Sequence, residues 1–318
     1  MAVLDFLSAN LLELFGYFDD ANKRIFWLYI VSALLLAAPV YWFSHKDRSL
    51  GKFFAYVFPK KVYTAKSARH DYMLLVCNKL IKAALFPLII FTMAPIAMSV
   101  SSAIEFVFGQ REFIQLSPAA IMAIFTLILF LFDDFTRFYL HYLLHRIPVL
   151  WEFHKVHHSA TVLTPFTIYR SHPVESYLYA CRMAITQGAA VGIGYYFFGP
   201  TLKMIDILGA NVFVFLFNLF GSNLRHSHIW LSWGDRVENW FLSPAQHQIH
   251  HSDQPMYHHS NFGAALAAWD RLFGTFRKAS EVKELTFGIG DSRVDHSSLA
   301  KIYWQPFALA AARFKRKG

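Results

Sequence analysis

Residues 118–158 read PAAIMAIFTLILFLFDDFTRFYLHYLLHRIPVLWEFHKVHH, and this stretch decides the fold. Its apolar part begins at Pro118, a favourable first residue of a helix, and helical character continues to His145. At 1.5 Å per residue such a helix reaches about 42 Å, against about 30 Å for the hydrocarbon core of a bilayer. We therefore predict a membrane-spanning helix that protrudes into the cytosol and carries His141 and His145 beyond the lipid.

Histidines at helical spacing gather in three short motifs of the chain. The motifs are HxxxH at His141 and His145, HxxHH at His154, His157 and His158, and HxxHH at His247, His250 and His251. Residues three and four apart share a helix face, so HxxxH aims two rings at one point and HxxHH aims up to three. Neutral imidazole is the commonest metal-binding side chain. Since one metal takes about four to six ligands, eight convergent rings predict two metals.

The bulk composition indicates a membrane protein. Of the 318 residues, 55% are hydrophobic and 16% are charged, whereas soluble proteins have about 25% charged residues. The net charge of +9 is first an orientation signal and a source of attraction to anionic lipid. No basic face with interleaved aromatics indicates nucleic-acid binding. Cys77 and Cys181 form no CxxC motif and indicate no disulfide framework.

The fold class that we expect is an all-α integral membrane protein with about four to five transmembrane helices and a cytosolic helical cap that carries the histidine-rich metal site. The N-terminus lacks the features of a signal peptide, so the first span is expected to be an uncleaved anchor. A short interfacial helix is expected within residues 1–24. The expected spans are residues 25–43, 83–104, 118–145, 177–198 and 201–221.

The charge of the loops predicts the orientation. Residues 44–82 are strongly basic, which places this loop in the cytoplasm by the positive-inside rule. The last two spans form an out-and-back hairpin between the second and third motifs, so all three motifs lie on the cytoplasmic face. We expect a single membrane domain over residues 1–318. Its parts are N-terminal anchor spans (1–117), a histidine-motif core (118–280) and a C-terminal cytosolic tail (281–318).

Which metal binds follows less directly from the residues. Imidazole suits iron, zinc, copper and nickel alike, but a structural zinc site needs only four ligands. An all-nitrogen site for two metals under a helix bundle fits redox-active iron better. Asp134 and Asp270 are candidates to orient ring N–H groups, with an Asp134–Arg137 pair as the alternative for Asp134. Five histidines outside the motifs are expected to be ordinary polar or solvated residues; these are His45, His70, His258, His259 and His296.

These motifs, in this order and between these spans, resemble the fatty acid hydroxylase/sterol desaturase superfamily of integral membrane di-iron enzymes. The resemblance covers roughly residues 120–280, and residues 1–115 match only as apolar anchor segments. The segments that carry it are Asp134–His145 followed by Arg-Ile-Pro, Trp151–His158, Thr164–Phe166, Ser171–Pro173, Ser243–Pro244, Asn261–Gly263 and Trp269–Thr275.

The resemblance implies a ninth ligand in a His-Ser-Asn context, where this chain has His226-Ser227-His228. His226 takes the place of the ligand, and whether His228 or His172 also binds metal stays open. The catalytic histidines are then the eight of the three motifs. The implied metal ligands are His141, His145, His154, His157, His158, His226, His247, His250 and His251.

The implied activity is the O2-dependent hydroxylation or desaturation of a C–H bond in a membrane lipid, with two iron ions as cofactor. An ether-lipid monooxygenase of the alkylglycerol type is the alternative within the superfamily. A membrane metal-binding or transport protein is the alternative of another class, and it would need ionisable groups along a path at mid-membrane depth. The chain has no dinucleotide-binding glycine motif, no cysteine set for an iron–sulfur cluster and no recognisable cytochrome b5 domain. A separate ferredoxin, cytochrome b5 or reductase is therefore expected as electron donor.

Overall fold

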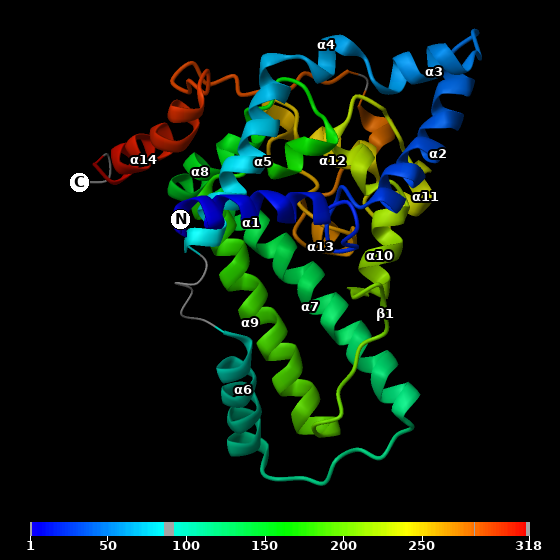
Figure 1. Ribbon diagram of the computed structural model, residues 1–318. Coiled ribbons are helices and arrows are strands. Elements are labelled where there is room, and N and C mark those ends of the chain that lie inside the picture. The colour runs from blue at the N-terminus through cyan, green and yellow to red at the C-terminus, as the bar shows by residue number, and fades with distance from the viewer. Residues whose placement is uncertain (1, 86–91, 283, 316–318) are drawn as a thin grey trace.

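The computed structural model describes residues 2–85, 92–282 and 284–315, and these are mostly helical. Two long helices, α7 (Pro118–Arg146) and α9 (Pro173–Phe198), run side by side in opposite directions and extend from a compact cap (Figure 1). The α6 helix (Met93–Phe108) packs on the far half of α9. A Cβ atom at Gly192 would lie 2.5 Å from the carbonyl oxygen of Ala97, so only glycine allows this close approach.

The α7 helix has the start and end that its sequence predicts. The Ser117 side chain accepts a hydrogen bond from the backbone N–H of Ala120, and Pro118 occupies the first turn. The helix ends at Arg146 because Ile147 precedes Pro148 and takes an extended conformation. Since α8 (Pro148–His158) begins at that proline, the first two histidine motifs lie on consecutive helices joined by a sharp bend.

Two of the described helices are long and apolar enough to cross a membrane, α2 (Trp27–Ser44) and α7. They correspond to the predicted spans 25–43 and 118–145. The α9 helix covers the predicted span 177–198 and begins four residues earlier. Residues 86–91 of the predicted span 83–104 lie outside the described residues. On either side of them, α5 (Lys66–Leu85) ends and the short apolar helix α6 begins.

The prediction of one helical span over residues 201–221 is wrong. The structure has a small antiparallel pair there, β1 (Asp206–Ile207) with β2 (Ala210–Asn211), followed by the eight-residue helix α10 (Val212–Leu219). Eight helical residues reach about 12 Å, which is too short to cross the core. Thr126 of α7 forms hydrogen bonds with this extended segment. Its hydroxyl accepts from Ile205 N at 2.7 Å, and its carbonyl accepts from Asn211 Nδ2 at 3.2 Å. The segment still runs back along α7 to the cap (Figure 1).

The cap is built from short helices and loops that follow α7, together with helices near both ends of the chain. Its later elements are α8, η2 (Pro165–Tyr169), η3 (Ser222–His226), α11 (Gly234–Glu238), α12 (Pro244–His250), η4 (Pro255–Tyr257), α13 (Ala268–Leu272), η5 (Ala279–Glu281) and α14 (Leu299–Lys315). The N-terminal part of the chain adds α1 (Ala2–Gly16), α3 (Leu50–Val57), α4 (Lys60–Tyr63) and α5. The α1 helix lies within the segment for which a short interfacial helix is expected.

Buried ionic contacts fix the elements around α8. The Arg170 guanidinium donates to Asp71 at 2.9 Å, and this pair joins η2 to α5. Glu152 of α8 accepts from Lys155 at 2.7 Å and from Arg313 of α14 at 2.9 Å. Residues 281–318, expected as a cytosolic tail, therefore include a helix that packs directly on the histidine-bearing helix α8.

Candidate metal centre

The structure brings all nine sequence-predicted histidines together at the junction of the cap and α7. They come from the end of α7, from α8, from the last residue of η3 and from α12 with its C-terminal neighbour. They form two groups of converging ring nitrogens. Group one contains His141, His145, His154, His158 and His250, and group two contains His157, His226, His247 and His251. Within each group the candidate ligand atoms lie within 4.8 Å of one another. That the nine bind metal stays a prediction.

Each HxxHH motif is divided between the two groups. His154 and His158, four residues apart on α8, face group one, whereas His157 faces group two. On α12, His247 and His251 face group two and His250 faces group one. A separation of four residues turns a helix by about 40° beyond a full turn, and a separation of three falls about 60° short of one. The two helices thus point the intervening histidine at the other group, and no motif aims three rings at one point.

The spacing of the Nε2 atoms fits a shared metal in each group. In group two, His226 Nε2 lies 3.0 Å from His251 Nε2, 3.1 Å from His247 Nε2 and 3.3 Å from His157 Nε2. Two nitrogens bound to one metal at about 2.1 Å lie about 3.0–3.4 Å apart at octahedral to tetrahedral angles.

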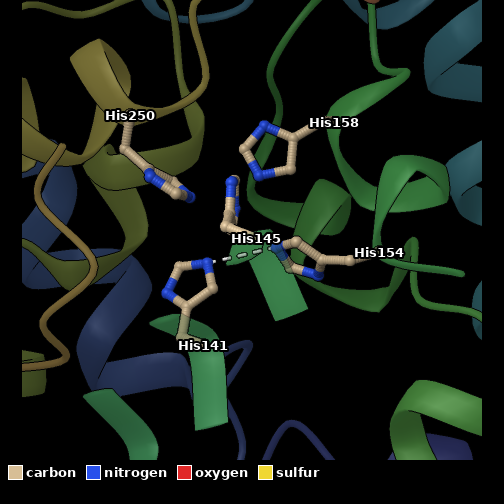
Figure 2. A group of neighbouring side chains, drawn as sticks. All are labelled: His141, His145, His154, His158 and His250. Carbon is tan, nitrogen blue, oxygen red and sulfur yellow. Dashed lines mark hydrogen bonds between the residues drawn. The ribbon is translucent and has the colours of Figure 1, made fainter. Parts of the chain in front are cut away.

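Group one also has Nε2 atoms spaced for a shared metal, and several of them have no hydrogen-bond partner in the described part of the chain. His141 Nε2 and His154 Nε2 lie 3.1 Å apart, and the five rings point toward one centre (Figure 2). The Nε2 atoms of His145, His158 and His250 are buried and have no hydrogen-bond partner among the described residues. Buried polar atoms without a partner are rare and need an explanation, and a metal ion at the centre supplies one.

Burial keeps these rings neutral, which is the form that binds metal. Desolvation lowers the pKa of His154 and of His157 from 6.5 to about 3. Desolvation and the neighbouring imidazoles lower the pKa of His158, His226 and His250 well below the usual value. No proton therefore has to leave these rings when a metal binds near neutral pH.

Backbone carbonyls orient several rings. The Nδ1–H of His141 donates to Phe262 O at 2.8 Å, and the Nδ1–H of His250 donates to Ser260 O at 2.9 Å. His157 donates in the same way to Arg170 O at 3.2 Å. A carbonyl only accepts hydrogen bonds, so each Nδ1 carries the proton and each Nε2 keeps a free lone pair that faces its group.

Glu175 is a functional residue that the sequence analysis missed. Its Oε1 accepts from His154 Nδ1 at 3.0 Å, and the carboxylate is buried in the first turn of α9. Desolvation raises the pKa of Glu175 to about 7, while the nearby histidines His157 and His172 lower it. The signal available in the sequence was its place two residues after Ser171-His172-Pro173, one of the segments that carries the family resemblance.

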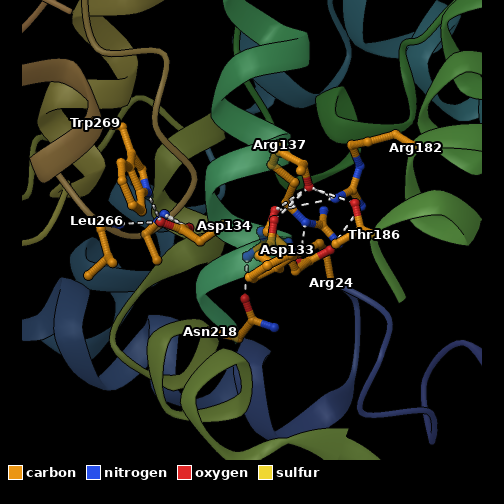
Figure 3. A network of polar contacts seen from close by, with 12 residues as sticks. Arg24, Asp133, Asp134, Arg137, Arg182, Thr186, Asn218, Leu266 and Trp269 are labelled. Carbon is orange, nitrogen blue, oxygen red and sulfur yellow. Dashed lines mark hydrogen bonds and ion pairs between the residues drawn. The ribbon is translucent and has the colours of Figure 1, made fainter. Parts of the chain in front are cut away.

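The expected roles of Asp134 and Asp270 are wrong, because neither carboxylate accepts a hydrogen bond from an imidazole ring. Asp134 accepts from Ala265 N, Leu266 N and Trp269 Nε1 at 2.7, 3.1 and 2.9 Å, and it holds the cap to α7 (Figure 3). The alternative Asp134–Arg137 pair is also wrong, because Arg137 pairs with Asp133 at 2.7 Å instead.

Asp270 acts on the site through the backbone. It accepts from Phe262 N and Gly263 N, each at 2.8 Å, and from the Thr275 hydroxyl. This fixes the Phe262 carbonyl that accepts from His141. The expectation failed because the chain folds back so that Asp270 lies next to Phe262 and Gly263, eight and seven positions earlier. Its carboxylate therefore reaches their backbone N–H groups and not the His141 ring.

The other histidines lie outside both groups. His172 caps α9 by accepting from Val174 N at 3.1 Å, and its Nε2 donates to Tyr303 O. His228 donates to Tyr56 O at 2.7 Å. His258 and His259 follow α12 in a loop, and His258 donates to Asp253 O at 2.9 Å. His45, His70 and His296 are not part of either group.

Two cavities reach the histidines from different sides. An inner cavity of about 280 Å³ is lined by His141 and His154 of group one, by His157, His226 and His247 of group two, and by residues of α5, α7 and α9. An outer cavity of about 530 Å³ is lined by His145, His158 and His250 and by cap residues. The rings therefore separate two spaces, and a small molecule has access from either one.

Comparison with known proteins identifies this region. The model of the fatty acid hydroxylase family matches residues 126–275, which contain all nine histidines. The histidine-bearing part of this chain belongs to the fatty acid hydroxylase family. The match lies inside residues 120–280, where the resemblance was drawn from the motifs, and it confirms that expectation. No solved structure was found to match the chain.

Similar curated proteins act on different lipids, as their names state. The chain is 26% identical over 163 residues to the alkylglycerol monooxygenase of Xenopus tropicalis, which covers 50% of this chain and 32% of that protein. It is 30% identical over 157 residues to the Delta(7)-sterol 5(6)-desaturase of Eremothecium gossypii, which covers 49% of this chain and 38% of that protein. It is 28% identical over 175 residues to the ornithine lipid hydroxylase OlsE of Rhizobium tropici, which covers 55% of this chain and 48% of that protein. The matched region thus spans between a third and a half of these relatives.

Proposed function

We propose that this protein is an O2-dependent di-iron oxidoreductase that hydroxylates or desaturates a C–H bond of a membrane lipid. The observation that carries the proposal is the pair of adjacent all-histidine groups, with five and four rings, at the end of a long apolar helix. Iron pairs held by histidine would supply the activation of O2 needed to break an unactivated C–H bond. Each of the nine histidines is proposed as a metal ligand through its Nε2 atom.

Other residues of the chain support this chemistry by positioning. Glu175 and the carbonyls of Phe262, Ser260 and Arg170 hold the ring orientations, which raises the basicity of the ligand nitrogens. Burial of the rings excludes bulk water, so that a reactive oxidant is directed to the substrate.

We propose a multi-pass membrane protein with the active site on the cytoplasmic face. The 29 residues of α7 reach about 43 Å, so His141 and His145 lie at the end that extends beyond a core of about 30 Å. The basic loop 44–82 belongs to the same cap as the histidines (Figure 1). The three-part division of one domain (1–117, 118–280 and 281–318) remains part of this proposal.

The electron donor is proposed to be a separate ferredoxin, cytochrome b5 or reductase. The outer cavity is the approach that we favour, because its lining has four cationic side chains (Arg146, Lys155, Arg293 and Arg313) against two carboxylates, Asp253 and Asp291, and this excess would attract an acidic protein. His145, His158 and His250 lie on the same wall, so an electron entering there has a short path to group one.

Neither alternative is favoured over this proposal. A transport protein needs ionisable groups along a path through the membrane. Here, Arg137 of α7 and Arg182 of α9 both pair with Asp133. The ether-lipid alternative matches two relatives, but sterol and ornithine-lipid enzymes match comparably well.

Metal content and oxygen consumption test the proposal. The full chain, purified in detergent and loaded with Fe(II) without air, is expected to hold two irons and to consume O2 when a reductant and lipid extract are added. Substitution His145→Ala or His247→Ala is expected to abolish oxygen consumption, whereas His45→Ala, outside both groups, is the matched control. A chain that binds iron but consumes no O2 with any reductant would refute the proposed activity.

A further inference from the structure

Two arginines next to the histidine groups have no carboxylate partner. Arg225 directly precedes His226, is 5% exposed, and has a buried Nε without a hydrogen-bond partner among the described residues. Its Nη2 donates to Leu242 O at 3.3 Å, and its guanidinium lies over the Phe217 ring, 4.7 Å from the centroid. Arg24, from the loop between α1 and α2, donates to the amide oxygen of Asn218. Neither arginine forms an ion pair with the described residues, although Arg225 is buried and buried charges are normally paired.

Both arginines line the inner cavity, whose wall is strongly cationic. Arg24, Lys82, Arg137 and Arg225 contribute positive charge, and Glu175 is the one carboxylate among the described residues that line it. Asp133 does not neutralise the excess, because it pairs with Arg137 at 2.7 Å and with Arg182 at 2.9 Å (Figure 3). Metal ions held by neutral imidazoles would add further positive charge. The cavity therefore requires an anion.

The inner cavity continues into an apolar groove. A small connecting cavity shares Arg24 and Arg137 with the inner cavity, and it shares Phe130 and Phe217 with the groove. The groove has a volume of about 540 Å³ and lies between α7, α10 and the cap, with aromatic and aliphatic side chains on its walls. A ligand that followed this path would meet cations next to the histidines, then the paired carboxylates Asp133 and Asp134 in the connecting cavity, and apolar side chains farther out.

We propose that the inner cavity binds the anionic head group of a lipid substrate, a carboxylate or a phosphate, while its apolar chain lies in the groove. This inference rests on the proposed function and names its substrate class. Guanidinium groups bind carboxylate and phosphate through paired charge-assisted hydrogen bonds, and these are strong in a desolvated site. A neutral sterol or glycerol head group would leave Arg24 and Arg225 unpaired.

Binding measured without turnover tests the inference. The full chain, loaded with Fe(II) under argon and without reductant, is titrated with palmitate, palmitoyl lysophosphatidate, monopalmitoylglycerol and inorganic phosphate. We expect the two anionic lipids to bind at least about tenfold more tightly than the neutral one, which is the effect of a hydrogen bond to a charged group. Equal affinity for monopalmitoylglycerol would overturn the inference, and so would inorganic phosphate binding as tightly as the lipids.

Substitutions locate the effect. Arg24→Gln is expected to remove most of the preference for the anionic lipids, and Arg24→Lys is expected to keep part of it. The matched control is Lys23→Gln, which removes a charge from the same loop but from a side chain paired with Asp20, 3.7 Å away. If folded Arg24→Gln protein keeps the full preference for anionic over neutral lipids, the assignment of Arg24 to the head-group site is overturned. If that variant does not fold, the comparison of lipids on the unsubstituted chain still decides.

The anionic head-group site and the proposed oxidoreductase activity can each fail independently of the other. Iron uptake and oxygen consumption that respond to a neutral lipid alone would refute the anionic head group and leave the activity standing. Tight binding of anionic lipids without oxygen consumption would refute the activity and leave the lipid site standing.

Discussion

Glu175 offers the most direct test of how the site is built, because among the described residues it is the one carboxylate that accepts from a proposed ligand. We expect Glu175→Ala to weaken metal binding at group one. Its Oε1 lies 3.0 Å from His154 Nδ1, so the substitution removes the acceptor that orients this ring. Loss of such an outer partner typically weakens metal affinity by 10- to 100-fold, or about 1.4–2.7 kcal/mol.

Glu175→Gln should fall at the lower end of that range. The amide oxygen still accepts from His154 Nδ1, but the negative charge that makes the ring more basic is lost. The effect should be confined to one of two metals, since His154 belongs to group one alone. A merely destabilised protein would instead lose both metals together.

The assay is an anaerobic titration of the metal-free protein with Fe(II) against a competing chelator. Glu152→Gln is the matched control, because Glu152 is also a buried carboxylate, on α8 itself, but pairs with Lys155 and Arg313. Two affinities in the Glu175→Ala protein that equal those of the unsubstituted chain would refute the orienting role of Glu175.

Three further predictions follow from the same contacts. His157→Ala and His158→Ala, although adjacent in sequence, should each impair a different metal of the pair, and spectra of the remaining iron that are identical in the two variants would contradict the grouping. Asp71→Asn should destabilise the fold by about 3–5 kcal/mol, because it leaves the buried Arg170 guanidinium unpaired; an unchanged unfolding midpoint in denaturant would argue against that. Burial lowers the pKa of His154 and His157 from 6.5 to about 3, so the metal-free fold binds fewer protons than the unfolded chain below pH 6.5. The free energy of unfolding of the metal-free protein should fall by about 1.4 kcal/mol per pH unit for each of these two histidines as the pH drops from about 6.5 toward 3. A melting temperature that stays constant between about pH 7 and about pH 5 would show the reasoning to be wrong.

The sequence alone predicted the eight motif histidines and the long helix that carries the first two, whereas His226 was added by the family resemblance. Both depend on local spacing, since helical periodicity of histidine and the length of an apolar run are read directly along the chain. The division of His157 from His154 and His158 also follows from helix geometry, but only once the position of the other rings is known.

What the sequence could not predict are contacts between distant segments. Glu175 lies on a different helix, 21 residues after His154, and no spacing rule connects the two. Residues 201–221 are apolar enough for a span, yet two hydrogen bonds that Thr126 accepts, from Ile205 and Asn211, stabilise an extended segment there. Asp134 has three N–H partners in residues 265–269, which only the folded cap brings within reach.

The contribution of α12 to both groups has a consequence for assembly. Group one needs His250 and group two needs His251, so neither can be complete before the chain has been synthesised past this point. The capping box of Ser243 and Gln246 starts α12 locally, but its histidines reach the others only when the helix docks against η3 and α8. We therefore expect metal loading to be a late step of biogenesis that follows closure of the cap, and we expect a chain that stops before His250 to be unable to retain either ion.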